Sequence, residues 1–384
     1  MSISLSDIKD FATPCYVYDT QLLARTLDAI KAEIAGHENY HVHYAIKANA
    51  NPNILRQIAT AGLGADCVSG GEIEAAIREG FPKQEIVFAG VGKADWEIKL
   101  ALEQGIGMFN VESVEELQVI NEWATSLQKH ARVSFRINPN VGAHTHAHIT
   151  TGKAENKFGV DMADMVRVIR MTEEMPLIDF TGLHFHIGSQ LLVMDDFVAL
   201  CKRVNELQDI LDREGIYAPN INVGGGLGID YNTPDEHPIP DFKAYFDTFK
   251  KGLQLRKGQH LHFELGRAVV GQMGALLTSV LYVKQGKQKQ FVIVDAGFTD
   301  LIRPALYGAH HDIENLSAEG RTTGKQTYDV VGPICESSDV FAKDLELPET
   351  QRGDIIAIRS AGAYGETMAS GYNCRKLPGV YTIK

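Results

Sequence analysis

The chain has 384 residues, of which 44% are hydrophobic and 22% are charged, which is typical of a globular protein of two or three domains. Its formal net charge of -12 disfavours nucleic acids and anionic membrane surfaces as partners. A small charged ligand is not excluded, because a locally basic pocket can lie inside an acidic protein.

The cysteines are scattered and form no C-x-x-C pair, so neither a disulfide framework nor a zinc cluster is expected. The first ten residues show no basic segment followed by an apolar run, and we predict no signal peptide. No apolar stretch approaches the roughly 20 residues that span a bilayer. These features favour a cytoplasmic protein without a membrane partner.

Strand and helix patterns alternate over the first two thirds of the chain. The first strand is predicted at 44–47, and an apolar-periodic helix follows over 53–61. Eight βα units would close a TIM-type barrel, and a doubly wound sheet is the alternative that strand number alone does not exclude. The seven further strands are predicted to end near Cys67, Ala89, Asn110, Asn138, Ile187, Val223 and Leu265.

After about residue 275, short strands are separated by turn residues, with little helix between them. The early strand 15–18 could join the same sheet. We therefore predict an α/β fold, with a barrel domain over 24–272 and an all-β domain made of 1–23 and 273–384. The late strands are predicted at 280–283, 291–294, 328–331, 354–358 and 380–383.

Reactive side chains lie at the predicted ends of the barrel strands, where this fold builds its active site. Lys47 is predicted to lie inside an apolar strand, where desolvation would lower the pKa of its amine and make it nucleophilic. Schiff-base chemistry requires such an amine. The alternative is a lysine that reaches solvent from a strand end. The other candidates are Arg136, His184, His186, Glu264 and Arg267.

The glycine run 224–228 follows the seventh predicted strand, where its backbone amides could approach a phosphate. Ile229 stands where the last glycine of a dinucleotide-binding motif would be, which argues against a dinucleotide-binding fold. Phosphate sites of TIM barrels follow strands seven and eight, which is where this run and Gly266 fall. A tight structural turn is the alternative.

Glu264 would favour a protonated ring if it faced a pyridine nitrogen, and a pyridinium is a strong electron sink. An ion pair with Arg267 is the alternative. His184 and His186 share a strand face, as metal-binding pairs of barrel hydrolases do, but those pairs lie on the first strand. The histidines at 144, 146, 148, 310 and 311 are interpreted as chance clusters, and no metal site is predicted.

In the β domain, Cys335 could donate a proton if its surroundings tune its pKa, although a buried, inert cysteine is commoner. Arg303 lies four residues before Tyr307, and an arginine can bind a carboxylate through two hydrogen bonds. The phenols of Tyr364 and Tyr372 are candidates for contacts with a phosphate.

Taken together, these motifs resemble the fold-type III pyridoxal 5'-phosphate (PLP) decarboxylases over nearly the whole chain. The resemblance implies an alanine racemase-like fold and a homodimer whose active sites are shared between subunits. Leu265 departs from the proline that the family usually has there, which loosens a turn and leaves the key side chains in place. The motifs lie at 44–49, 155–159, 184–190, 224–228, 303–307, 335–339 and 362–365.

The resemblance also implies how the cofactor is held. Lys47 would form the Schiff base, and His186 would stack on the ring, which replaces the metal interpretation of the histidine pair. Glu264 would face the ring nitrogen. The remaining cofactor contacts would come from Ser189, Gly225, Gly226, Gly266, Arg267 and Tyr364.

For the substrate, the resemblance implies that a carboxylate far from the reacting carbon binds Arg267, Arg303 and Tyr307, with Tyr364 nearby. Glu336 would meet the distal ammonium. Cys335 would protonate the carbanion after carbon dioxide leaves, and the partner subunit would supply both Cys335 and Glu336.

The implied reaction is loss of carbon dioxide from the D-configured centre of meso-2,6-diaminopimelate, which gives L-lysine as the last step of lysine biosynthesis. Ornithine, arginine or carboxynorspermidine are the alternative substrates within the same fold. A racemase is disfavoured, because such enzymes place an arginine where Glu264 is expected. A metal-dependent hydrolase and a non-catalytic PLP carrier are the alternatives from other classes, and the β domain argues against the carrier.

Overall fold

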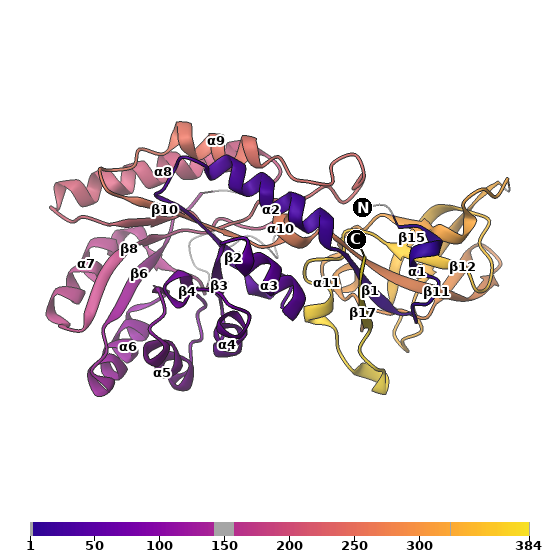
Figure 1. The fold of residues 1–384 in the computed structure, drawn as a ribbon, viewed down its shortest axis with the longest axis horizontal. Coiled ribbons are helices and arrows are strands. Elements are labelled where there is room, and N and C mark those ends of the chain that lie inside the picture. The colour runs from indigo at the N-terminus through magenta and orange to yellow at the C-terminus, as the bar shows by residue number, and fades with distance from the viewer. Residues whose placement is uncertain (1–2, 142–156, 323, 384) are drawn as a thin grey trace. The chain divides into compact units, whose positions relative to one another are not determined.

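The computed structural model describes residues 3–141, 157–322 and 324–383, and its chain divides into two compact units (Figure 1). The barrel unit comprises Leu27–Gly228 and Asp241–Gly266. The β unit comprises Met1–Thr26, Ile229–Pro240 and Arg267–Lys384. The segment 229–240, which follows the glycine run, therefore belongs to the β unit. The domain bounds predicted from the sequence, 24–272 for the barrel domain and 1–23 with 273–384 for the β domain, remain predictions.

Eight parallel strands form a closed ring in the barrel unit, because β5 pairs with β6 as well as with β4. The TIM-type barrel is thereby confirmed, since a doubly wound sheet would keep two open edges. The strands are β2 (Tyr40–Ala45), β3 (Gly64–Cys67), β4 (Ile86–Phe88), β5 (Met108–Val111), β6 (Ala131–Asn138), β8 (Ile178–His184), β9 (Asn220–Asn222) and β10 (His260–Leu265).

Helices cover the outside of the barrel (Figure 1). The Ser69 and Ser113 side chains accept the backbone N–H groups of Glu72 and Glu116, which caps two of these helices directly after their strands. The helices of this layer are α3 (Pro52–Thr60), α4 (Gly70–Arg78), α5 (Asp95–Gln104), α6 (Val114–Leu127), α7 (Met165–Met171), α8 (Met194–Arg213) and α9 (Phe242–Gly252). Helix α2 (Thr20–Ile34) leads into the barrel, and the short strand β7 (Val160–Asp161) pairs with β6.

Lys47 does not lie inside a strand. Strand β2 ends at Ala45, and Lys47 lies in the 3-10 turn Ile46–Ala48 as an exposed residue. Its neighbours Ile46 and Ala48 are buried, so the turn is anchored on both sides of Lys47. The prediction that burial in a strand desolvates Lys47 is therefore wrong for the chain by itself.

The β unit is built on a mixed sheet. Strand β1 pairs with β11 and β17, which confirms that the early strand joins the late ones. The strands β13 and β15 were not predicted. The strands are β1 (Cys15–Asp19), β11 (Gly274–Gln285), β12 (Gln290–Val294), β13 (Ile313–Asn315), β14 (Lys325–Val331), β15 (Val340–Pro348), β16 (Ile355–Ile358) and β17 (Gly379–Ile383), and the helices are α1 (Leu5–Ile8), α10 (Arg267–Val270) and α11 (Arg303–Tyr307).

Among the residues that the structure describes, none of the helices combines the length and the apolar character that a bilayer crossing needs. Within the same ranges, no group of three or more His, Cys, Asp or Glu side chains is arranged to hold a metal ion. The histidines at 144, 146 and 148, and residues 155 and 156 of one family motif, lie outside the described residues.

Candidate active site

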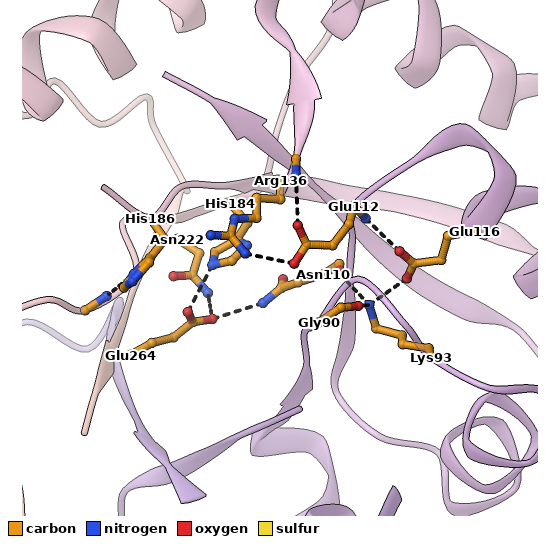
Figure 2. Close-up of polar contacts among 12 residues, drawn as sticks. Gly90, Lys93, Asn110, Glu112, Glu116, Arg136, His184, His186, Asn222 and Glu264 are labelled. Atoms are coloured by element: carbon orange, nitrogen blue, oxygen red, sulfur yellow. Dashed lines mark hydrogen bonds and ion pairs between the residues drawn. The ribbon is translucent and has the colours of Figure 1, made fainter. Parts of the chain in front are cut away.

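Glu264 lies inside the barrel near the carboxyl end of β10 and is buried. Its Oε1 atom accepts hydrogen bonds from the side-chain amides of Asn110 (3.0 Å) and Asn222 (2.8 Å), and its Oε2 atom lies 2.9 Å from Nε2 of His184 (Figure 2). Burial alone would raise the pKa of this carboxyl, but His184 and the Asn222 hydrogen bond outweigh burial and hold the pKa below its usual range. Glu264 is therefore held as a carboxylate, and its imidazole partner is His184.

The contacts of Glu264 leave room for one more donor. Each carboxylate oxygen accepts about two hydrogen bonds. Within the described part of the chain, Oε1 receives two amide donors, whereas Oε2 faces only the imidazole of His184. A protonated pyridine nitrogen is a donor of the kind that Oε2 can still accept, so the geometry fits the predicted role of Glu264.

Buried polar atoms beside Glu264 lack hydrogen-bond partners among the described residues: Oδ1 of Asn110, Nδ1 of His184 and Oδ1 of Asp66. Burial, and then the charge of Glu264, raise the pKa of Asp66 well above its usual value, while Lys47 opposes them. Buried polar atoms are almost always hydrogen-bonded in native proteins. Several unpartnered atoms grouped in the barrel interior offer contacts for a polar ligand, and a pyridoxal ring with its phenol and phosphate is such a ligand.

Lys47 lies close enough to His186 for its positive charge to affect the pKa of the imidazole. Burial lowers the pKa of His186 well below its usual value, and the positive charges of Arg136 and Lys47 lower it further. The backbone N–H of Gly225 donates to Nδ1 of His186 over 3.4 Å, which ties the imidazole to the glycine run. A neutral imidazole fixed in this way is suited to stacking on an aromatic ring.

The glycine run has no space for side chains. A Cβ atom on Gly225 would overlap the carbonyl oxygen of Glu264, and one on Gly226 would lie 2.7 Å from the carbonyl oxygen of Gly188. Gly226 also has a φ of 101°, which favours glycine. A bridge between Leu191 and Leu227 aligns this run with the loop that contains Ser189. The glycine run and the loop with Ser189 are therefore neighbouring segments, which fits a phosphate site built from both.

A buried ion pair lies next to the Glu264 network. Nη1 of Arg136 lies 2.8 Å from Oε1 of Glu112, and Oε2 of Glu112 accepts the backbone N–H of Gly159 over 2.9 Å (Figure 2). The Arg136 guanidinium also lies 4.6 Å from the ring centroid of Phe158. Arg136 and Glu112 therefore join the carboxyl ends of β5 and β6 to residues 158 and 159.

Glu112 is in turn supported from α6. Its backbone N–H donates to Oε2 of Glu116 (2.8 Å), and Oε1 of Glu116 binds Nζ of Lys93 at 2.6 Å. The sequence reading missed Glu112, Glu116 and Lys93. The Ser113-x-x-Glu116 spacing, typical of a capping box, is the signal that could have located Glu116.

In the β unit, two buried arginines lie around one tyrosine. Nη1 of Arg267 donates to the Tyr231 hydroxyl at 2.5 Å, and the Arg303 guanidinium lies 5.0 Å from the Tyr231 ring centroid. Arg267 also lies 5.0 Å from the ring centroid of Tyr364. In the described ranges, Arg303 forms no ion pair with an acidic side chain. A buried guanidinium with only neutral acceptors is suited to binding a ligand carboxylate.

Cys335 and Glu336 lie on the surface of the β unit. The backbone N–H of Cys335 donates to Oδ1 of Asn373 (3.2 Å), and the Tyr372 hydroxyl donates to Glu336 (2.8 Å). The alternative that Cys335 is buried is therefore wrong. The Tyr372 phenol therefore contacts Glu336. Tyr307, at the end of α11, is 41% exposed.

The predicted site residues divide between the two units. Sequence reasoning missed Tyr231, Asn110 and Asn222, and it interpreted His311 as one of a chance pair, whereas His311 is buried against Arg303. No local motif marks these residues. The barrel unit carries Lys47, His186, Ser189, Gly225, Gly226, Glu264 and Gly266, and the β unit carries Arg267, Arg303, Tyr307, Cys335, Glu336 and Tyr364.

Comparison with known proteins agrees with this chemistry. Residues 21–271 match the family model described as the pyridoxal binding domain of pyridoxal-dependent decarboxylases. The chain is 63% identical over 378 residues to the diaminopimelate decarboxylase of Bacteroides thetaiotaomicron, covering 98% of this chain and 97% of that one. It is 43% identical over 373 residues to the diaminopimelate decarboxylase of Zymomonas mobilis, covering 96% and 86% of the two chains.

Among solved structures, diaminopimelate decarboxylase from Helicobacter pylori complexed with L-lysine matches with a TM-score of 0.91 and 39% identity, covering 98% of this chain and 93% of that one. The lysine/ornithine decarboxylase of Vibrio vulnificus matches with a TM-score of 0.82 at 21% identity, which shows the fold alone. The predicted alanine racemase-like fold and the dependence on PLP are thereby confirmed. The chain belongs to the diaminopimelate decarboxylases, within the pyridoxal-dependent decarboxylase family.

Proposed function

We propose that this chain decarboxylates meso-2,6-diaminopimelate to L-lysine and carbon dioxide with PLP, as the last step of lysine biosynthesis. The observation that carries the choice of substrate is Arg303, a buried guanidinium whose partners in the described residues are neutral. A diamine-forming enzyme would need a carboxylate for the distal ammonium of its substrate. An arginine instead suits a substrate that keeps a carboxylate at its distal end.

PLP, when bound, supplies the electron sink for the electrons that remain when carbon dioxide leaves. Lys47 would hold the cofactor through its amine, His186 would stack on the ring, and Glu264 would keep a proton on the ring nitrogen. The support for Glu264 is its ionised state and the open acceptor position on Oε2. The phosphate would be held by Ser189, Gly225, Gly226, Gly266 and Tyr364.

Around the substrate, Arg267, Arg303 and Tyr307 would bind the distal carboxylate, and Glu336 would meet the distal ammonium. The Cys335 thiol would deliver the proton to the carbon that loses carbon dioxide. We propose a cytoplasmic homodimer in which Cys335 and Glu336 serve the partner's site. The exposure of both residues on the β unit supports a role of this kind.

A substrate panel tests the proposal. Purified protein is incubated with PLP and, separately, with meso-diaminopimelate, ornithine, arginine and carboxynorspermidine, and the product is identified by mass spectrometry. We expect L-lysine from meso-diaminopimelate at the highest kcat/KM. Borohydride reduction should leave the cofactor on the peptide that contains Lys47, and Lys47→Ala should show neither turnover nor this adduct. Faster turnover of another member of the panel would overturn the choice of substrate.

A further inference from the structure

His311 makes two hydrogen bonds from a buried position in the β unit. Its Nε2 atom lies 2.9 Å from Nη1 of Arg303, and its Nδ1 atom lies 2.8 Å from the backbone carbonyl oxygen of Arg359. The imidazole is 2% exposed, so both contacts are shielded from water. The ring therefore joins the residue predicted to bind substrate to the backbone just beyond strand β16.

The two partners determine where the proton of His311 lies. A carbonyl oxygen only accepts, so Nδ1 must carry the hydrogen, and a guanidinium only donates, so Nε2 must offer its lone pair to Arg303. The imidazole is thus neutral and in a single tautomer. Burial, and then the positive charge of Arg303, lower the pKa of His311 to about 3, so this state persists across the physiological range.

Tyr231 acts on the same arginine from another side. Its ring lies 5.0 Å from the Arg303 guanidinium and meets the His311 ring edge-on, with centroids 5.1 Å apart. Its hydroxyl accepts from Arg267. Arg303 is therefore contacted by the imidazole of His311 and by the ring of Tyr231, and neither contact is with a carboxylate.

Two acidic side chains of this region pair with Arg359 rather than with Arg303. Asp235 lies 2.6 Å and Glu314 lies 2.5 Å from the guanidinium of Arg359, whose carbonyl oxygen orients His311. A carboxylate at the position of His311 would neutralise Arg303 and compete with an incoming anion. The imidazole avoids this competition, because it directs the guanidinium without cancelling its charge.

We propose that His311 is a positioning residue for substrate recognition: it orients Arg303 toward the distal carboxylate of the substrate and leaves the positive charge of Arg303 available to that carboxylate. The inference rests on the proposed function and extends it to a residue with no direct substrate contact. By this proposal, His311 enables the site to discriminate between L-lysine, which has a distal carboxylate, and cadaverine, the same diamine without that carboxylate.

The test compares three substitutions at one position. His311→Gln keeps a neutral acceptor, His311→Glu has the same size but adds a negative charge, and His311→Leu removes the acceptor. His310→Leu changes the exposed neighbour and serves as the control. For each purified variant loaded with PLP, we would measure KM and kcat for meso-diaminopimelate, and the dissociation constants of L-lysine and cadaverine.

We expect His311→Leu to raise the KM for meso-diaminopimelate and to weaken L-lysine binding by roughly tenfold, since a charge-assisted hydrogen bond then no longer orients Arg303. The change in kcat should be smaller, and cadaverine binding should stay within about twofold of wild type. His311→Gln should restore most of the L-lysine affinity, and His310→Leu should resemble wild type.

The pair His311→Glu and His311→Gln keeps the test decisive if His311→Leu folds poorly. The proposal requires that the glutamate variant bind L-lysine more weakly than the glutamine variant, although a glutamate still holds Arg303. Equal affinities for the two variants, or equal losses for L-lysine and cadaverine, would overturn it. Failure of the proposed function looks different, because the wild-type protein would then not turn over meso-diaminopimelate at all.

Discussion

Glu264 and His184 meet inside the barrel, with Oε2 of the carboxylate 2.9 Å from Nε2 of the imidazole. The two residues come from β10 and β8, which are not neighbours in the ring because β9 lies between them. The contact helps keep a buried carboxylate ionised, which is the state that can hold a proton on a pyridine nitrogen.

Glu264→Gln should reduce kcat for meso-diaminopimelate by roughly 100-fold, because an amide carries no charge to stabilise a protonated ring. Glutamine has nearly the same size, so PLP binding, measured by cofactor absorbance, should change little. Wild-type kcat in a PLP-loaded Glu264→Gln protein would contradict the assigned role of the carboxylate.

Asn222→Ala should raise the pKa of Glu264, because the amide donates a hydrogen bond to the ionised form. A carboxylate whose pKa rises is protonated at higher pH, so activity should be lost earlier on acidification. The measurement is the pH dependence of kcat, in which the acid limb should move toward neutral pH relative to wild type. An acid limb in the same place for both proteins would show that the amide does not tune this carboxyl.

Arg136→Met should destabilise the protein by about 3–5 kcal/mol, because it leaves the buried carboxylate of Glu112 without its cation. Urea unfolding measures the change. The matched control is the double variant Arg136→Met with Glu112→Met, which removes both charges and should recover part of the loss. A single variant as stable as wild type would show that the pair contributes little.

Cys335→Ala should lower turnover by roughly 100-fold or more if this thiol is the proton donor, while PLP binding stays intact. Cys374→Ala is the control, since Cys374 is the other exposed cysteine of the described chain. Full activity of Cys335→Ala would assign the proton to another group.

The neutral state of His311 predicts a pH dependence of stability. The unfolded chain binds a proton on this imidazole near pH 6.5, whereas the folded chain does so only at about pH 3. The unfolded state thus holds more protons between these values, so stability falls as the pH falls through this window. His311→Gln lacks this proton. Between roughly pH 6 and 4, its free energy of unfolding should therefore fall by about 1.4 kcal/mol less per pH unit than that of wild type. Parallel profiles would show that His311 is protonated in the folded protein.

The sequence by itself determined the number and order of the barrel strands and most strands of the late sheet, because strand and helix periodicity is a local property of the chain. It also located the glycine run, since only glycine tolerates the backbone positions at 225 and 226. The strands β13 and β15 escaped prediction, because one is only three residues long and the other is interrupted by exposed charged residues.

Only the tertiary structure decided the surroundings of the reactive side chains. Asn110 lies 154 residues before Glu264, and Tyr231 lies 36 residues before Arg267, so no local pattern joins either pair. Closure of the ring brings Asn110 to Glu264, and the departure of 229–240 from the barrel unit brings Tyr231 to the arginines. The exposure of Lys47 was likewise set by the fold, because β2 ends at Ala45 and Lys47 lies in the 3-10 turn that follows. Residue type and order specify the helices and strands, whereas the burial of a side chain and its contacts depend on how distant segments of the chain pack.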